Sequence, residues 1–397
     1  MAEEEEKKTK RPENGPFRQQ RLPAWQPVLI PRNVLPTLFI FGIIFCPIGG
    51  LLYWNSGRVN EIMINYSYCG QYQQPVYLAD SLFDYQFSSE ENLSQMQPPA
   101  YHVENSTSFL DPSWQNPNNL PIPQCILDFT VPSTMVGPIY MYYRLTNFYQ
   151  NHRLYIKNLD ADQLLGTAST GSTIHTNCDP LATNDDGLWI YPCGLIANSM
   201  FNDTASNFTL ISDNTGNQPQ QYNFTTSNIA WPTDKQKYKP TQYANTQIVP
   251  PPNWAKRYPN GRYDDQHPPP DLSSMERFMV WMHVAALPDF RKIWARNDND
   301  NLEAGRWRVA IDMNFDTLQY EGTKWLVLST TTPLGGRNPY LGIAYMAIGA
   351  ICLFLGLVFT LRHLIRPRKL GDPSYLSWNQ PGGGLPKNKR AKHLHKE

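Results

Sequence analysis

Two long uncharged stretches near the ends of the chain restrict its fold more than any other feature. The first, Val34 to Trp54, and the second, Leu341 to Leu361, contain no Asp, Glu, Lys or Arg. A helix rises about 1.5 Å per residue, so about 20 apolar residues cross the hydrocarbon core of a bilayer. The sequence therefore predicts two transmembrane helices, with residues 55–340 together on one side of the membrane.

The charges that flank the two stretches indicate which side that is. Lys and Arg are enriched at the cytosolic ends of membrane helices. The tails, residues 1–33 and 362–397, hold sixteen basic and seven acidic residues, whereas residues 55–340 hold eighteen and twenty-seven. Before the first span lie Arg18, Arg21 and Arg32, and after it lies Arg58. After the second span lie Arg362, Arg366, Arg368 and Lys369, and before it lie Lys324 and Arg337. Both tails are expected to be cytosolic.

A cleaved signal peptide is the competing interpretation of the first stretch. Such a peptide has a short basic leader, an apolar core of about 7–15 residues and a cleavage site with small residues. Here residues 1–33 precede a longer apolar run, and the bulky pair Tyr53 and Trp54 ends it. These features favour an uncleaved anchor.

Cysteines and glycosylation sequons test this orientation independently. Cys46 and Cys352 lie inside the predicted spans, where they are expected to pack as apolar side chains. The other four cysteines and all six N-x-S/T sequons fall within residues 55–340, which suits an oxidising lumenal or extracellular compartment. The cysteines are Cys69, Cys125, Cys178 and Cys193, and the sequons begin at Asn65, Asn92, Asn105, Asn202, Asn207 and Asn223.

Four cysteines permit three pairings. Cys178 and Cys193 bracket a short segment rich in turn-forming residues, so their closure is entropically the easiest, and Cys69 would then pair with Cys125. A Cys69–Cys178 bond would contradict this assignment.

The central region, residues 55–340, is expected to form one β-rich α+β domain with long proline-rich connections. Four segments have the aromatic or β-branched composition of strands, and the last two are expected to pair as a hairpin that leads into the second span. Two other segments have helical patterns. The strand segments are Gln124–Val131, Pro138–Leu145, Trp307–Phe315 and Lys324–Thr330, and the helical ones are Arg144–Asn158 and Met275–Ala286.

Motifs for catalysis are absent from the sequence. It contains no P-loop, no Asp-Lys-Thr-Gly phosphorylation motif, no H-E-x-x-H and no G-x-S-x-G. Two D-x-D triplets, Asp160–Asp162 and Asp298–Asp300, are reminiscent of the metal-nucleotide clamp of glycosyltransferases, but no strand-helix alternation surrounds them. The second triplet is better interpreted as a turn whose side chains bind their own backbone. We therefore expect no catalytic residue, metal or cofactor.

Several long motifs follow one another in order along the chain. They extend from the central region into the second span. The motifs are Asn147 to Arg153 (NFYQNHR), Tyr191 to Thr204 (YPCGLIANSMFNDT), Ile229 to Asp234 (IAWPTD), Pro251 to Trp254 (PPNW), Arg257 to Gly261 (RYPNG), Phe278 to Met282 (FMVWM), Ala285 to Pro288 (AALP), Phe290 to Lys292 (FRK) and Leu328 to Tyr345 (LSTTTPLGGRNPYLGIAY).

These motifs resemble the cell-division-control-protein-fifty or ligand-effect-modulator family, and the cysteine number resembles that of a fungal member. This resemblance implies a non-catalytic β subunit of a type IV P-type ATPase, a phospholipid flippase. The implied partner is the ATPase α subunit, which the β subunit helps to leave the endoplasmic reticulum and to complete its phosphorylation cycle. Phospholipid then moves from the lumenal or outer leaflet to the cytosolic one, in a membrane of the Golgi, the endosome or the cell surface. The resemblance also implies the disulfides Cys69–Cys125 and Cys178–Cys193.

Glycosylation is expected first at Asn202, in the motif that the resemblance covers. The sequons of Asn92, Asn105, Asn207 and Asn223 are further candidates. Asn65 lies only eleven residues beyond Trp54, too near the bilayer for efficient glycan transfer.

Contacts with the partner are expected at two places. Trp254, Tyr258 and Asn260 lie in stiff proline-containing loops, where an exposed aromatic side chain binds with little entropy loss. Glycines recur at intervals of seven in both spans, which places them on one face of each helix, as in closely packed membrane helices. They are Gly42 and Gly49 in the first span and Gly342, Gly349 and Gly356 in the second.

A two-span cell-surface lectin or receptor is the alternative function. The sequence has neither a cytosolic signalling domain nor a cluster of aromatic and carboxylate residues typical of a sugar site. Co-purification with a pump-sized protein would distinguish the two.

Overall fold

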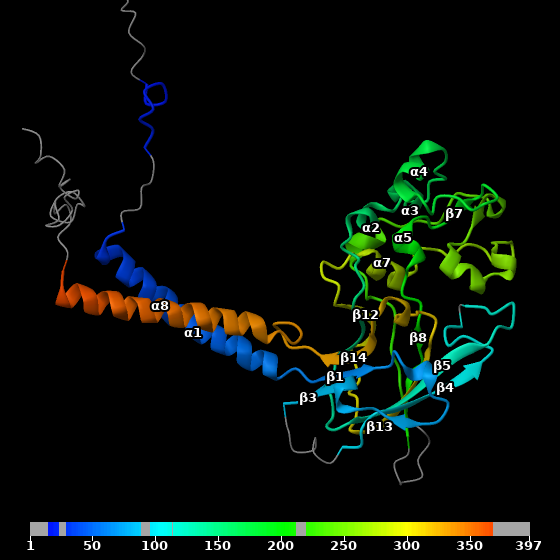
Figure 1. Ribbon diagram of the computed structural model, residues 1–397, viewed down its shortest axis with the longest axis horizontal. Coiled ribbons are helices and arrows are strands. Elements are labelled where there is room, and N and C mark those ends of the chain that lie inside the picture. Colours follow the sequence, from blue (N-terminus) through cyan, green and yellow to red (C-terminus); the bar gives the residue numbers. More distant parts are fainter. Residues whose placement is uncertain (1–14, 24–28, 89–95, 113, 212–219, 368–397) are drawn as a thin grey trace, which may run out of the picture. The chain divides into compact units, whose positions relative to one another are not determined.

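The computed structural model describes residues 15–23, 29–88, 96–112, 114–211 and 220–367. It divides into two compact units, one within Met1–Leu51 and Tyr340–Glu397 and the other within Leu52–Pro339. Figure 1 shows a pair of long helices in the first unit and mixed strands and short helices in the second.

The first unit consists of two apolar helices. Helix α1 spans Pro31–Gly57 and α8 spans Pro339–Ile365, and both are long and apolar enough to cross a membrane. They contain the two predicted spans. Pro36 and Pro47 lie inside α1. Proline removes one backbone hydrogen bond from a helix, a loss that membrane helices tolerate where neighbouring groups compensate.

The second unit is built on two sheets, as predicted for a β-rich domain. One sheet has the strand order β12-β6-β14-β1-β3 and the other β10-β9-β13-β5-β4-β2, with β8 also paired to β13. Neighbouring strands in both sheets are antiparallel, whereas the short β11 and β7 pair in parallel. The strands of the first sheet are β1 Glu61–Asn65, β3 Phe83–Gln86, β6 Ile139–Leu145, β12 Phe290–Asn297 and β14 Lys324–Thr330. The other strands are β2 Val76–Tyr77, β4 Ala100–Ser106, β5 Ile122–Val131, β7 Trp189–Ile190, β8 Thr204–Ala205, β9 Phe208–Leu210, β10 Gln221–Tyr222, β11 Ile248–Val249 and β13 Gly305–Asp312.

The short α-helices that Figure 1 labels gather on one side of the sheets. The α-helices are α2 Arg153–Lys157, α3 Ala161–Leu164, α4 Ser172–Cys178, α5 Leu195–Asn198, α6 Pro232–Lys235 and α7 Glu276–Met282. The 3₁₀ helices are η1 Cys69–Gln71, η2 Asp80–Leu82, η4 Asn245–Gln247, η5 Pro252–Arg257, η6 Pro259–Gly261 and η7 Leu318–Tyr320. Four tryptophans in the domain core, Trp254, Trp281, Trp294 and Trp307, are at most 2 % exposed.

The four predicted strands are present, but the predicted hairpin is wrong. β13 pairs with β5 over all eight residues, from Gly305 opposite Val131 to Asp312 opposite Gln124. β14 lies in the other sheet, between β1 and β6. Alternating polarity indicates that a segment has one buried face, but it does not determine which strand lies beside it.

The predicted helix Arg144–Asn158 is also wrong over most of its length. Arg144 and Leu145 continue β6, and only Arg153–Lys157 is helical. Asn147 adopts a left-handed φ of 58°, and its Nδ2 donates to the Tyr320 carbonyl at 2.5 Å. Apolar spacing alone could not indicate this break.

Helix α7 ends before the predicted Ala286. The ammonium of Lys292 on β12 donates to the carbonyls of Trp281 and His283, at 2.7 and 2.5 Å. Terminal carbonyls of a helix need partners outside it. Lys292 supplies them, and His283 turns into an extended conformation.

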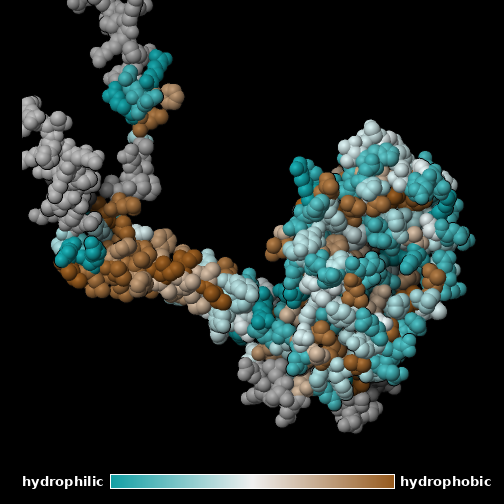
Figure 2. Space-filling view, viewed as in Figure 1, coloured by the Kyte–Doolittle hydropathy of each residue, from teal (hydrophilic) through white to brown (hydrophobic). Residues whose placement is uncertain are grey.

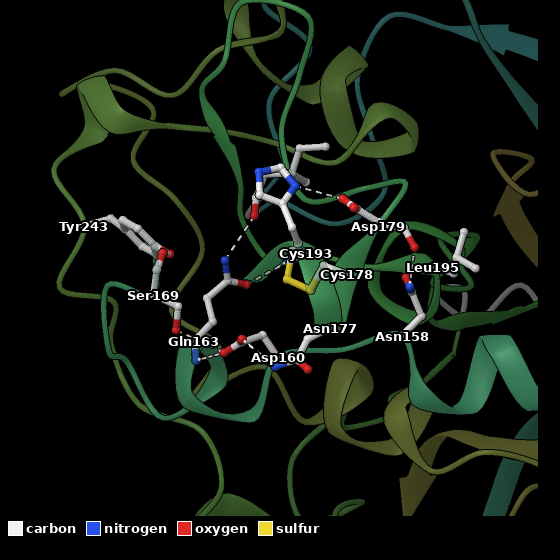
Figure 3. The surroundings of a disulfide bond; sticks show 12 residues. Asn158, Asp160, Gln163, Ser169, Asn177, Cys178, Asp179, Cys193, Leu195 and Tyr243 are labelled. Carbon is white, nitrogen blue, oxygen red and sulfur yellow. Dashed lines mark hydrogen bonds and ion pairs between the residues drawn. A yellow bond between two sulfur atoms is a disulfide. The ribbon is translucent and has the colours of Figure 1, made fainter. Parts of the chain in front are cut away.

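Two disulfides lie in the domain, in the expected pairs. Cys69–Cys125 connects η1 to β5, and Cys178–Cys193 closes a separation of 15 residues after α4. Figure 3 shows the second bond among polar side chains, of which Asn158, Asp160 and Gln163 are buried. There the Cys193 amide donates to Gln163 Oε1 at 2.8 Å, and the Leu195 amide donates to Asn158 Oδ1 at 2.6 Å.

Candidate functional site

The helices α1 and α8 touch through their glycines. A methyl group added at Gly349 would lie 2.7 Å from Cys46 Sγ and 2.9 Å from the Cys46 amide nitrogen, and one at Gly42 would lie 3.1 Å from the Gly349 carbonyl. One at Gly49 would lie 2.8 Å from the Gly342 carbonyl. We call Gly42, Gly49, Gly342 and Gly349 the glycine seam. Only residues without a side chain allow this backbone approach.

The rest of each helix surface is largely apolar and exposed (Figure 2). Gly356 lies beyond the seam, where an added methyl group would meet the Phe39 ring at 3.2 Å. The seam therefore joins the two helices and leaves their other faces exposed. Strongly exposed apolar side chains on these faces are Ile43, Leu51, Ile351, Phe354, Leu357 and Leu361.

The structure corrects the prediction that Trp254 is an exposed contact residue. Its side chain is only 1 % exposed, and its ring centroid lies 5.9 Å from that of Phe278. Tyr258 is half-buried against Tyr263, with ring centroids 4.7 Å apart. Asn260 is exposed and has a left-handed φ of 52°. The 3₁₀ helix η5 places Trp254 in the core. The proline-rich composition of this segment is typical of a loop and gave no indication of this burial.

The described sequon asparagines differ in accessibility. Asn105, Asn207 and Asn223 are exposed, whereas Asn65 and Asn202 are only 2 % and 9 % exposed. The hydroxyl of Thr204, in the Asn202 sequon, donates to the Asp312 carboxylate. Asn92 lies outside the described residues.

The two D-x-D triplets have structural roles in the folded domain. Asp160 caps α3, accepting from the Gln163 amide at 2.7 Å (Figure 3). The amides of Asn299 and Asp300 donate to Asn297 Oδ1 at 3.0 and 2.9 Å, so the second triplet is the predicted turn. Within the described residues, no group of three or more His, Cys, Asp and Glu side chains is placed to hold a metal ion.

A buried ionic network that sequence reasoning missed connects three parts of the domain. Asp203 Oδ2 accepts from Lys324 Nζ at 2.7 Å and from the Tyr66 hydroxyl at 3.0 Å, and its Oδ1 accepts from the amides of Asn314 and Phe315. Burial and the adjacent Asp203 carboxylate raise the pKa of Tyr66. Residues so far apart in the chain leave no local signal of their contact.

Two exposed apolar side chains lie beside a pair of loops that are joined by hydrogen bonds. Phe148 N donates to the Pro288 carbonyl at 3.1 Å, and Asn151 Nδ2 donates to the Ala286 carbonyl at 2.9 Å. Next to these bonds, Tyr149 and Leu287 are 59 % and 67 % exposed. We call Tyr149 and Leu287 the apolar loop pair.

These observations define a class of protein. Two apolar helices are long enough to span a membrane and are packed through glycines, and the residues between them in the chain form one large disulfide-bonded domain of mainly antiparallel strands. The chain is a two-span membrane protein. It belongs to the LEM3 (ligand-effect modulator 3) family / CDC50 family, whose model matches residues 52–369. The predicted family is confirmed.

Curated relatives match almost the whole chain. Phospholipid-transporting ATPase accessory subunit CDC50 of Chaetomium thermophilum is 40 % identical over 94 % of this chain and 92 % of the relative. Phospholipid-transporting ATPase accessory subunit CRF1 of Saccharomyces cerevisiae is 39 % identical over 94 % and 90 %. Cell cycle control protein 50A of Mus musculus is 36 % identical over 88 % of each chain.

Proposed function

We propose that this protein is the accessory subunit of a phospholipid-transporting type IV P-type ATPase. The observation that carries the proposal is the match, over nearly the full chain, to fungal relatives named as accessory subunits of such ATPases. The fold agrees with a non-catalytic role, because its buried carboxylates and its D-x-D triplets are held in structural hydrogen bonds. The ATPase would supply the energy and the transport path.

The domain is proposed to lie on the lumenal or extracellular side, with both tails in the cytosol. Three features support this topology: the excess of basic residues in the tails, the two disulfides and the exposed sequons of Asn105, Asn207 and Asn223. Glycans are proposed at these sites, at Asn92 and at Asn202. An oxidising compartment is where such disulfides persist.

The accessory subunit is further proposed to help the ATPase leave the endoplasmic reticulum and remain stable. Phospholipid would then move to the cytosolic leaflet of a Golgi, endosomal or plasma membrane. The names of the relatives support the role in phospholipid transport, and the apolar outer faces of α1 and α8 offer a surface for the helices of the ATPase.

Native purification tests the proposal. The tagged full chain is extracted in mild detergent from its own organism, with an unrelated two-span glycoprotein as the control. We expect a stoichiometric companion well above the 45.6 kDa of this chain, identified by mass spectrometry as a type IV ATPase. Recovery of the chain alone under conditions that preserve known membrane complexes would count against the proposal.

A further inference from the structure

The second unit contains a cavity that the proposed function does not use. Its volume is about 630 Å³, within the range of about 300–1,000 Å³ found for small-molecule sites. Parts of five segments line it, and they combine aromatic, proline and methionine side chains with two arginines. The lining includes Trp114, Ser227, Arg257, Met275 and Arg277.

Arg257 is the main unexplained group of this cavity. Arg257 is only 9 % exposed, and its Nη2 atom is buried with no hydrogen-bond partner among the described residues. The guanidinium carbon lies 3.3 Å from the ring centroid of Trp114 and 5.8 Å from that of Trp254. Burial lowers the pKa of Arg257 to about 9. A buried cation is costly unless an anion or a hydrogen-bond acceptor compensates it.

Arg277 also lines this cavity and brings a second guanidinium group to it. Its Nη2 donates to the Asp203 carbonyl at 2.5 Å, and its carbon lies 6.0 Å from the Trp114 ring centroid. Burial lowers the pKa of Arg277 as well. An arginine carries five N–H donors in a planar fork, a geometry that matches carboxylate and phosphate oxygens.

The carboxylates on the cavity wall already have other partners. Glu276 accepts from Lys235 at 2.7 Å and from the amides of Ile229 and Ala230. Asp271 accepts from the amide and the hydroxyl of Ser273. Asp111 is also engaged in an interaction, although its charge attracts both arginines. The two guanidinium groups therefore form no ion pair within the part of the chain that the structure describes.

We propose that this cavity binds a small organic anion, with a phosphate or carboxylate group on Arg257 and Arg277 and an apolar body against Trp114 and Met275. The volume exceeds that of a bare phosphate ion, and the apolar lining favours a ligand with a body as well as a charge. The Trp114 ring would cover one face of the Arg257 guanidinium, while the N–H groups at the edge of the guanidinium donate to the oxyanion.

The test uses the purified full chain in detergent and three probes: phenyl phosphate, inorganic phosphate and phenol. Binding is followed by tryptophan fluorescence and by the melting temperature. We expect saturable binding of phenyl phosphate, weaker binding of phosphate and none of phenol. R257Q is expected to weaken phenyl phosphate binding about tenfold or more, as for loss of a charged hydrogen bond. R308Q is the matched control, because Arg308 is an exposed arginine paired with Asp128.

A second variant keeps the test decisive if R257Q fails to fold. S227W introduces a bulky side chain at an exposed cavity residue and retains both arginines, so it is expected to abolish phenyl phosphate binding. Glycerophosphoserine carries the phosphate of a lipid headgroup on a polar body. Preference for phenyl phosphate over glycerophosphoserine supports the proposal, and the opposite preference would overturn the role of the apolar body. Absence of saturable binding to every anion, or binding unchanged in R257Q and S227W, would overturn it. Equal affinity for inorganic phosphate would overturn the role of the apolar body.

Discussion

The ammonium of Lys324 lies 2.7 Å from Oδ2 of Asp203, and the two side chains are 2 % and 0 % exposed. The pair connects the start of β14 to the loop before β8. Lys324 Nζ also donates to the Phe315 carbonyl at 2.7 Å, so both partners have further hydrogen bonds. A buried ion pair is favourable only when its remaining polar atoms are satisfied in this way.

Removing one member of this pair is predicted to destabilise the domain strongly. D203A leaves the Lys324 ammonium buried without its anion, for which a loss of about 3–5 kcal/mol is typical. Thr204 and Asn202 are unchanged, so the sequon is retained. The measurement is the melting temperature of the purified chain, with K324M and the double variant D203A/K324M alongside. The double variant should lose less stability than the two single variants added together; simple additivity would show that the two residues act independently.

Stability is predicted to depend on pH through Lys292. Burial lowers the pKa of Lys292 to about 7, whereas an unfolded lysine has a pKa of about 10.4. Between these values the unfolded chain binds a proton that the native chain lacks, so this group makes stability rise with pH. Below about pH 7 both states are protonated, and the contribution no longer changes.

K292M removes this titration and is therefore the informative variant. The melting temperature of the wild type, relative to that of K292M, is expected to increase from pH 7 to pH 9 and to stay level from pH 6 to pH 7. K239M, which changes an exposed lysine, is the control and should follow the wild type throughout. Parallel curves for wild type and K292M would show that Lys292 keeps its charge in the folded domain.

The sequence predicted features that depend on local composition. The two spans were evident because a membrane imposes a minimum apolar length, and Lys324–Thr330 matched β14 in both bounds. Strand partners were not predictable, because the neighbours of β14 come from Glu61–Asn65 and Ile139–Leu145, far away in the chain. The Asp203–Lys324 pair was missed for the same reason.

Trp254 illustrates how tertiary packing overrides local signals. W254A is predicted to lower stability by about 3–5 kcal/mol, as for other buried tryptophans. W254F should cost far less, because Trp254 Nε1 has no hydrogen-bond partner among the described residues to be lost. Melting temperature and protein level measure both changes. N260G changes an exposed left-handed residue without backbone strain and should leave stability unchanged. An unaffected W254A protein would contradict the buried position.

The apolar loop pair is predicted to contribute to partner binding without contributing to folding. Y149S/L287S alters two side chains that are mostly exposed, and such changes usually alter stability by less than about 0.5 kcal/mol. Recovery of the ATPase by co-purification is expected to fall while the melting temperature is retained. V136S is the control, since Val136 is a similarly exposed apolar residue at another loop. Unchanged recovery of the ATPase would exclude the pair from the interface.

The glycine seam is predicted to hold α1 and α8 together within the membrane. G349L places a large side chain where even a methyl group would lie 2.7 Å from Cys46 Sγ, so the two helices must separate. G50L adds the same side chain to α1 at a position with no atom within 4 Å of the added methyl group, which makes it a matched control. Membrane insertion should be normal in both variants, because leucine is as apolar as the span requires. Disulfide crosslinking between cysteines introduced at Phe45 and Tyr345, whose ring centroids lie 5.2 Å apart on the two helices, measures the contact directly. G349L should reduce its yield whereas G50L should not. Equal crosslinking in the two variants would show that the helices do not depend on the seam for their contact.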